Sequence, residues 1–299
     1  MDRQTITLTK LPASVCKLAY YEPVGALTRL KLESPVNLSA ITNLIALDPA
    51  IVAEVLVAAN SPVYGFAAKV YTVQDAIMVL GWGQTQRVVR AALEADVSPK
   101  LSTRRLIERS WAHSLVSACV ASELAPSFDL SEDRAFTLVL MHDIGRLGML
   151  STAPDVCVEL ADREYADSIE VLEAENRQLR MDHCRAGLWL ARAWGLPAAF
   201  CEIAAGHHGL VPEIGRTPVV LAGLACRLAH VGGFTVEGRT PPTLEQALSI
   251  VEKSLASEVR RCWDQIQSRS HERLLQLTSS LCDLSAIRHG CAQESGRFT

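Results

Sequence analysis

The segment FTLVLMHDIGRLGML, residues 136–150, is a long apolar run in which two polar residues, His142 and Asp143, stand side by side. Burial of either group without a partner is costly, because water no longer satisfies its hydrogen bonds or its charge. A chain that buries this pair must therefore bring other polar groups to it. This requirement restricts the fold to one in which several distant segments converge on residues 142–143.

The composition favours helices as the elements that converge. Hydrophobic residues make up 49% of the 299 residues but aromatic residues only 5%, so the core is aliphatic. Ala, Leu and Val recur in stretches that lack the alternation of a half-buried strand. We therefore expect an all-α fold, a multi-helix bundle, with enough length for one large domain or two modest ones.

Charge and cysteine usage exclude several classes of protein. The net charge is −4 with both signs interspersed, so there is no basic face for nucleic acid. Nine cysteines without CxxC pairs indicate reduced thiols and a cytoplasmic protein. No apolar window reaches the roughly 18 residues of a membrane span, and the N-terminus lacks the apolar region of a signal peptide. We expect a soluble protein with no nucleic-acid or membrane partner.

Turn and capping residues divide the chain into expected helices. Short helices are expected between residues 11 and 95, with Asn60 as a C-terminal cap and Thr72 as an N-terminal cap. Longer helices are expected near residues 104–125, 131–150, 168–178, 182–194, 197–208 and 218–230. The second of these longer helices would carry both His142 and Asp143.

A further helix is expected beyond a Gly-, Thr- and Pro-rich loop at residues 232–243. Apolar residues recur there at three- and four-residue steps: Val259, Trp263, Ile266, Leu274, Leu277, Leu281 and Leu284. This stripe indicates an amphipathic helix that must bury its apolar face. Two partners for that face are open at this point, the body of the same chain or a second copy in a homodimer.

Five of the eight histidines fall in the middle of the chain, on successive expected helices. With Asp143 they form a candidate ligand set: His113, His142, His183, His207 and His208. Imidazole nitrogens with carboxylates suit iron, manganese or zinc, and only a folded bundle can bring these groups together. The alternative is that the histidines are core residues hydrogen-bonded to backbone carbonyls, with no metal bound.

Three segments resemble the core of the HD superfamily of metal-dependent phosphohydrolases: SWAHSLVSACVASELA, MHDIGRLGML and DHCRAGLWLARAWGLPAAFCEIAAGHH. Further upstream, LPAS (11–14), ITNLIALDPAIVAEVLVAANSPVYG (41–65) and TVQDAIMVLGWGQTQRVV (72–89) are similar to the HDOD domain, a bacterial signalling-output relative. The resemblance covers residues 8–232. It implies an N-terminal helical subdomain (8–110) and an HD-like helical subdomain (111–232). The apolar stripe beyond it predicts a C-terminal helical extension (244–299).

The resemblance also implies roles for particular residues. His113, His142 and Asp143 would be metal ligands, with His183, His207 and His208 as additional ligands of the kind found in the cyclic-dinucleotide branch. The family's last ligand is an aspartate, and Cys226 stands in its place. A thiolate binds zinc or iron but does not replace a hard carboxylate that bridges two metal ions. The alternative for Cys226 is a small buried apolar residue.

Two other departures bear on catalysis. Arg146 stands where the family has a lysine, and its charge can hold a phosphate, so Asp143 and Arg146 are the residues that would act in an active enzyme. The alternative for Arg146 is a salt-bridged helix residue. The Gly-Tyr-Pro signature of the branch that cleaves cyclic di-GMP is absent from HHGLVPEIGRTP, residues 207–218, which argues against that activity.

We therefore expect a bacterial regulatory output protein of signal transduction that lacks catalytic activity and binds another signalling protein. One alternative is a metal-dependent phosphohydrolase that acts on a nucleotide or another phosphate ester. The other is a sensor that binds a metal or a nucleotide without turnover and changes its helix arrangement. Metal content and turnover separate the three hypotheses.

Overall fold

The computed structural model describes residues 18–33, 38–65, 69–94, 100–209, 215–238 and 240–294. In these ranges the chain is helical, and the only β-type pairing is an isolated bridge between Glu164 and Gly238. The expected all-α fold is confirmed. None of the helices in the described part is long and apolar enough to cross a lipid bilayer.

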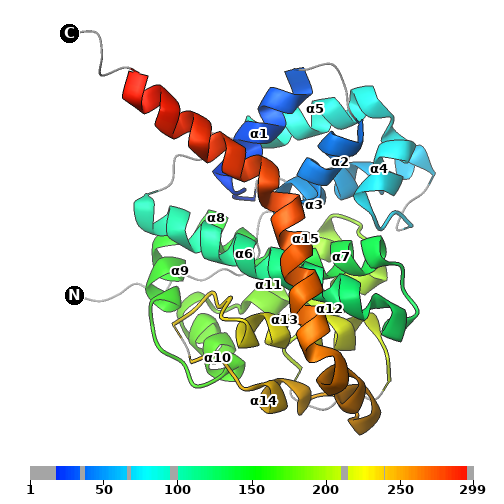
Figure 1. The fold of residues 1–299 in the computed structure, drawn as a ribbon, viewed down its shortest axis with the longest axis vertical. Helices are drawn as coiled ribbons and strands as arrows, with labels where there is room; N and C mark the ends of the chain where they lie inside the picture. Colours follow the sequence, from blue (N-terminus) through cyan, green and yellow to red (C-terminus); the bar gives the residue numbers. More distant parts are fainter. Residues whose placement is uncertain are drawn as a thin grey trace.

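The α-helices are, in chain order, α1 (Glu22–Glu33), α2 (Leu38–Ile45), α3 (Pro49–Ala59), α4 (Val73–Leu80), α5 (Trp82–Leu93), α6 (Leu101–Leu124), α7 (Glu132–Leu140), α8 (Ile144–Thr152), α9 (Pro154–Ala161), α10 (Ser168–Leu179), α11 (His183–Ala193), α12 (Ala198–Gly206), α13 (Pro218–Val231), α14 (Leu244–Leu248) and α15 (Lys253–Glu294). Short 3₁₀ turns lie at Pro62–Tyr64 and Ala125–Phe128. Figure 1 shows α1–α5 at one end of the molecule and α10 and α14 at the other.

Helix α6 lies in the middle of the bundle and packs against α7, α13 and α15. One hydrophobic core cluster extends from Leu18 near the N-terminal end of the described chain to Ile266 in α15. The three expected parts of the chain therefore contribute to a shared core. Their boundaries at residues 110, 232 and 244 stay predictions.

The helix ends in the N-terminal region follow the expected capping residues. The Thr72 hydroxyl accepts a hydrogen bond from the Asp75 amide and starts α4, and Asn60 follows the last residue of α3. Asp48 is buried before Pro49 and accepts hydrogen bonds from the amides of Ala50 and Ile51. Each cap satisfies amides or carbonyls that the helix leaves without partners.

The single helix expected over residues 131–150 was wrong. The chain forms α7 up to Leu140 and α8 from Ile144, with a turn at residues 141–143. In this turn the amides of His142, Ile144 and Arg146 each bond to the carbonyl three residues earlier. The apolar pattern continues through the turn because Met141 and Ile144 are buried on both sides of it, which hides the break in the sequence. The turn places His142 and Asp143 at the junction of two helices.

A close helix crossing sets His183 beside this junction. Gly145 in α8 approaches the backbone of α11 so closely that a Cβ atom built on it would lie 1.9 Å from the His183 carbonyl oxygen and 2.5 Å from the Gly187 amide. Only glycine permits this approach without a shift of backbone. The first residue of α11 therefore lies next to the turn that carries Asp143.

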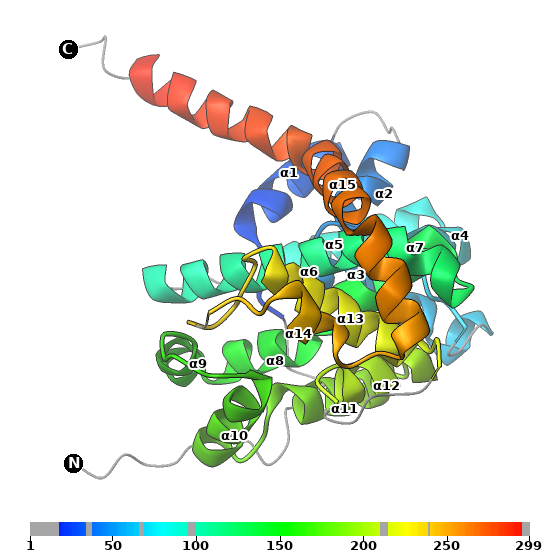
Figure 2. The same ribbon diagram turned by 60° about the horizontal axis from the view of Figure 1, so that its bottom comes forward.

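The C-terminal helix α15 packs back on the body of the protein over the part whose side chains are described. It contacts α6 and α1, and Figures 1 and 2 show it crossing one face of the molecule. Val259 and Ile266 are buried, while Trp263, Leu274 and Leu277 are partly buried against the core. The side chains of Leu281 and Leu284 lie outside the described residues. The apolar stripe thus packs on the body of the same chain up to Leu277. Homodimer formation stays a prediction.

Candidate metal centre

The six side chains predicted as metal ligands converge in the interior of the bundle. They come from α6 (His113), the turn between α7 and α8 (His142 and Asp143), the start of α11 (His183) and the residues that follow α12 (His207 and His208). Each is at most 5% exposed, and neighbouring imidazole centroids lie 4.2 to 5.5 Å apart. The structure therefore brings the whole predicted set together, while metal binding by it stays a prediction.

Backbone carbonyls determine the tautomers of His113 and His142. Nδ1 of His113 lies 2.8 Å from the carbonyl oxygen of Phe234, and Nδ1 of His142 lies 2.6 Å from that of Val139. A carbonyl oxygen only accepts, so each Nδ1 carries a proton and each neutral ring presents a lone pair at Nε2. These two Nε2 atoms lie 3.2 Å apart. Burial lowers the pKa of both rings, so a proton shared between the two Nε2 atoms is disfavoured.

Acceptor atoms also face one another around Oδ1 of Asp143. Nε2 of His207 lies 3.3 Å from this oxygen and Nε2 of His183 lies 3.5 Å from it. Nδ1 of His207 lies 3.1 Å from the Ile203 carbonyl, and Nδ1 of His183 lies 2.7 Å from the Glu175 carboxylate, so the proton of each neutral ring is on Nδ1. As long as both rings are neutral, Oδ1 of Asp143 and both Nε2 atoms lack a hydrogen-bond partner.

His208 completes this side of the cluster. It is 5% exposed, and neither of its ring nitrogens has a hydrogen-bond partner. Two groups of possible metal ligands both contain Asp143: one with His183, His207 and His208, the other with His113 and His142. Within each group the ligand atoms lie within 4.8 Å of one another. Unpartnered buried acceptors that converge in this way are the arrangement that a divalent cation satisfies. The residues present therefore fit one metal ion, or two that share Asp143.

Carboxylates and Cys184 set the protonation of the rings on the Asp143 side when no cation is bound. Burial and the Arg146 charge oppose a charged ring at His183, but Glu175, Cys184 and Asp143 outweigh them and raise the pKa of His183 to about 10. Burial opposes charge at His207 too, but Cys184 and Asp143 raise the pKa of His207 well above its usual value. A metal ion and a proton cannot occupy the same Nε2 lone pair of His183 or His207, so metal binding at these atoms releases protons.

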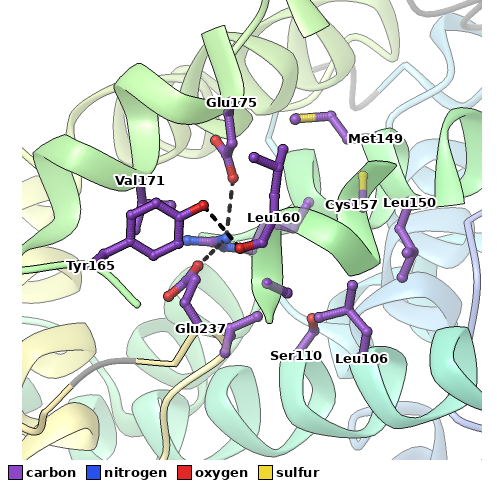
Figure 3. A pocket seen from close by; sticks show the side chains of 13 residues that line it. Leu106, Ser110, Met149, Leu150, Cys157, Leu160, Tyr165, Val171, Glu175 and Glu237 are labelled. Carbon is purple, nitrogen blue, oxygen red and sulfur yellow. Dashed lines mark hydrogen bonds and ion pairs between the residues drawn. The ribbon is translucent and has the colours of Figure 1, made fainter. Parts of the chain in front are cut away.

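Arg146 is held by three buried carboxylates. Its Nε donates to Oδ2 of Asp143 at 2.8 Å, and one terminal nitrogen forms ion pairs with Glu175, at 3.3 Å, and with Glu237. Figure 3 shows the two glutamates on two sides of a small, mostly apolar pocket whose open space is about 30 Å³. The salt-bridged alternative for Arg146 is the one that the structure shows. Its charge is engaged by the protein.

Three buried residues of this site were not among the predicted ones. Glu175 orients His183, Glu237 pairs with Arg146, and His230 stacks on His113 with ring centroids 4.6 Å apart. For the two glutamates the sequence carries no signal, because a glutamate on a polar helix or in a loop is normally solvated. His230 had a signal, since it follows Cys226 by four residues and lies on the same face of α13.

Cys226, which stands where the resemblance places an aspartate, lies inside the cluster. It is 1% exposed, and its Sγ lies 3.5 Å from Nε2 of His113. His113, Cys226 and His230 each offer one donor atom within 4.8 Å of the other two. The chain therefore has a third group of possible ligands, which contains sulfur and adjoins the two groups that contain Asp143.

A pocket of about 390 Å³ borders the cluster from outside. His208 and His230 line it, together with Arg227, the start of α10 and residues from the loop and helix between 240 and 249. This volume is enough for a small molecule. His208 and His230 thus border this pocket, and His207 lines a second, smaller one of about 20 Å³.

Comparisons with known proteins agree with this architecture. The MmoQ response regulator from Methylococcus capsulatus is 22% identical with a TM-score of 0.62, over 79% of this chain and 99% of that one. A virulence factor from Campylobacter jejuni is 17% identical with a TM-score of 0.60, over 85% of this chain and 90% of that one. At such identities these likenesses show a shared fold.

Sequence comparison extends to a curated protein and to a family. An uncharacterized protein of Treponema pallidum is 23% identical over 185 residues, which are 60% of this chain and 35% of that protein. The chain thus spans about a third of the length of this relative. The model of the HDOD domain matches residues 24–210. Since this match spans more than half of the sequence, the chain belongs to the HDOD domain family.

Proposed function

We propose that this protein is a cytoplasmic regulatory output protein of signal transduction that acts by binding another signalling protein and holds a divalent metal ion as a structural or sensory element. The observation that carries the metal part is the set of unpartnered acceptors on Asp143, His183 and His207. The MmoQ protein, which shares the fold, is a response regulator, and this supports the regulatory role.

Charge balance supports a divalent ion in the centre. Three buried carboxylates, on Asp143, Glu175 and Glu237, face a single guanidinium, that of Arg146. In the metal-free protein, protons on His183 and His207, whose pKa values are raised, offset this negative charge. A divalent cation held by Asp143 and the histidines would replace those two protons without a change in net charge. Iron, manganese and zinc all accept such a donor set.

Two features favour a role without turnover. The charge of Arg146 is held by carboxylates, so it is withdrawn from a substrate phosphate. Cys226 takes the position of a carboxylate, and a soft thiolate at that position changes both the charge and the metal preference of the centre. The protein's own residues therefore bind and enclose an ion more readily than they bind and position a phosphate ester.

A metal-dependent phosphohydrolase is the second candidate, and the pocket lined by His208 and His230 favours it. A phosphate ester in this pocket would lie against two histidines and Arg227, on the accessible side of the cluster. A bound divalent ion would supply Lewis-acid activation of water for hydrolysis. In this mechanism Asp143 and the histidines would hold the ion, and the enclosing helices would exclude bulk water.

Elemental mass spectrometry of freshly purified protein tests the proposal, together with turnover of a panel of nucleotides and phosphate esters. One or two equivalents of metal per chain, lost in a His142→Ala/Asp143→Ala double variant, with no hydrolysis by the wild type, are the expected results. Hydrolysis that disappears in the double variant would replace the proposal by the phosphohydrolase. A metal-free, folded wild type that also fails to take up added metal would contradict the metal part.

A further inference from the structure

We propose that His113, Cys226 and His230 form a sulfur-containing zinc site, distinct in its metal preference from the Asp143 side of the cluster. The inference rests on the proposed function in one respect, since it assigns one position of the proposed metal centre. It gives Cys226 a role as a thiolate ligand, and it adds His230, which the resemblance does not imply, to the ligands.

Helix packing preorganises the three donors. Cys226 and His230 are one turn apart on α13, which packs against α6 and so faces His113. The three residues are 1%, 3% and 1% exposed for Cys226, His230 and His113. The bond from Nδ1 of His113 to the Phe234 carbonyl fixes this ring with its Nε2 lone pair towards the sulfur. A carbonyl that orients a histidine in this way is a usual second partner of a metal ligand.

Two of the donor distances match those around one tetrahedral ion, and the donor atom of His230 lies within 4.8 Å of those of His113 and Cys226. Two nitrogens held about 2.0–2.1 Å from a tetrahedral zinc ion lie about 3.3 Å from each other, and a nitrogen and a sulfur at about 2.3 Å lie about 3.5 Å apart. In the protein, Nε2 of His113 lies 3.2 Å from Nε2 of His142 and 3.5 Å from Sγ of Cys226. His142 is therefore the nearest further donor for the ion.

A neutral thiol at Cys226 does not account for the arrangement. Its S–H can donate to Nε2 of His113, but a single proton satisfies only one of the two lone pairs that meet there. Nε2 of His142 would still face the His113 ring without a donor. Zinc binding resolves both contacts, because the thiol proton leaves to solvent and the ion takes its place between the donors.

The donor type separates the two sides of the cluster. Imidazole and thiolate together select zinc among the common divalent ions, whereas a carboxylate with three imidazoles also accepts iron or manganese. The Cys226 side is therefore expected to keep zinc under conditions in which the Asp143 side exchanges its metal.

Cobalt substitution tests the assignment on the full-length protein. Metal is removed with a chelator, Co²⁺ is titrated in, and the near-ultraviolet absorption is followed, because a cobalt-bound thiolate gives an intense sulfur-to-metal charge-transfer band that imidazole and carboxylate ligands do not give. Cys184 offers a matched control, since it is a buried thiol at the edge of the same cluster, with its Sγ 4.0 Å from Nδ1 of His207. Circular dichroism verifies that each variant is folded.

The expected result is a charge-transfer band in the wild type and in Cys184→Ser that is lost in Cys226→Ser and in Cys226→Ala. His230→Ala should weaken cobalt affinity at this position at least tenfold. Cobalt uptake without the band, or a band lost in Cys184→Ser and kept in Cys226→Ser, overturns the sulfur site but leaves the proposed metal centre in place. No cobalt or zinc uptake at all overturns both.

Discussion

Polar side chains are buried both at Asn60 and in the histidine cluster, but the two regions differ in whether these side chains have hydrogen-bond partners. Asn60 is 3% exposed, and its amide donates to the carbonyls of Leu56 and Val70 and accepts from the amides of Lys69 and Val70. Around Asp143, the carboxylate oxygen and the Nε2 atoms of neutral His183 and His207 face one another without donors. Complete satisfaction marks Asn60 as structural, whereas the unmet acceptors mark a place for a ligand.

The largest effect in this comparison is expected from Asn60→Ala. It removes the side-chain partner of the Val70 carbonyl and of the amides of Lys69 and Val70, whereas the Leu56 carbonyl keeps its bond from the backbone amide of residue 60, and each group left without a partner costs about 1–3 kcal/mol before relaxation. We expect the free energy of unfolding in urea to fall by about 3–5 kcal/mol. Asn176→Ala, at an exposed position of α10, is the control and should change it by less than about 0.5 kcal/mol. A loss below about 1 kcal/mol for Asn60→Ala would remove the contrast.

Asp48 extends the comparison to a buried polar group that titrates. It is 1% exposed and accepts three backbone hydrogen bonds, from Tyr21, Ala50 and Ile51, but burial outweighs them and raises the pKa of Asp48 from 3.8 to about 6. The folded state therefore binds this proton more tightly than the unfolded state, so stability increases as the pH falls through 6 towards 4.

The shift corresponds to about 3 kcal/mol over that interval. About 2 kcal/mol of it falls between pH 7 and pH 4.5. Urea unfolding of the wild type and of Asp48→Asn over this range measures that part, because other titrating groups cancel in the difference. The asparagine variant should lack this part of the pH dependence. Parallel curves for the two proteins would show that the Asp48 carboxyl titrates at its ordinary pKa.

Much of the helical architecture was predictable, because local chemistry decides it. Capping and turn residues placed the expected helix at 182–194 on α11, His183–Ala193, and the one at 168–178 on α10, Ser168–Leu179. The break at 141–143 was missed, because burial on both sides of the turn extends the apolar run through it. Where tertiary packing interrupts a helix, periodicity alone does not report the interruption.

The site divides in a similar way. The residues His142 and Asp143 stand out because they interrupt an apolar run, and the resemblance to the HD superfamily implied the other four. Glu175 and Glu237 stay hidden in the sequence, since only the packing of distant helices and loops removes them from water and turns them towards Arg146. The candidate metal ligands were thus predictable, but Glu175, which orients His183, and Glu237, which pairs with Arg146, were not.

Glu175→Gln is expected to weaken metal binding by the histidine cluster. Oε2 of Glu175 accepts hydrogen bonds from the backbone amide and from Nδ1 of His183. The carboxylate charge orients the His183 ring and keeps its Nε2 basic, and the glutamine side chain lacks that charge. Metal affinity, measured by competition with a chromophoric chelator, should fall about 10- to 100-fold, which is about 1.4–2.7 kcal/mol. Glu173→Gln, at an exposed position of the same helix, should leave the affinity unchanged. Equal affinities for Glu175→Gln and the wild type would separate Glu175 from the centre.

The smallest effect is expected from His208→Leu in chelator-treated protein. Because neither nitrogen of His208 has a hydrogen-bond partner, the apolar side chain removes no bond, and the free energy of unfolding should change by less than about 1 kcal/mol or increase. His113→Leu, equally buried, deprives the Phe234 carbonyl of its donor and should cost more. With metal present the order changes, since both variants then also lose a ligand and should bind metal less tightly. If His208→Leu destabilises the metal-free protein as much as His113→Leu does, its nitrogens have partners after all and this side of the cluster needs no cation.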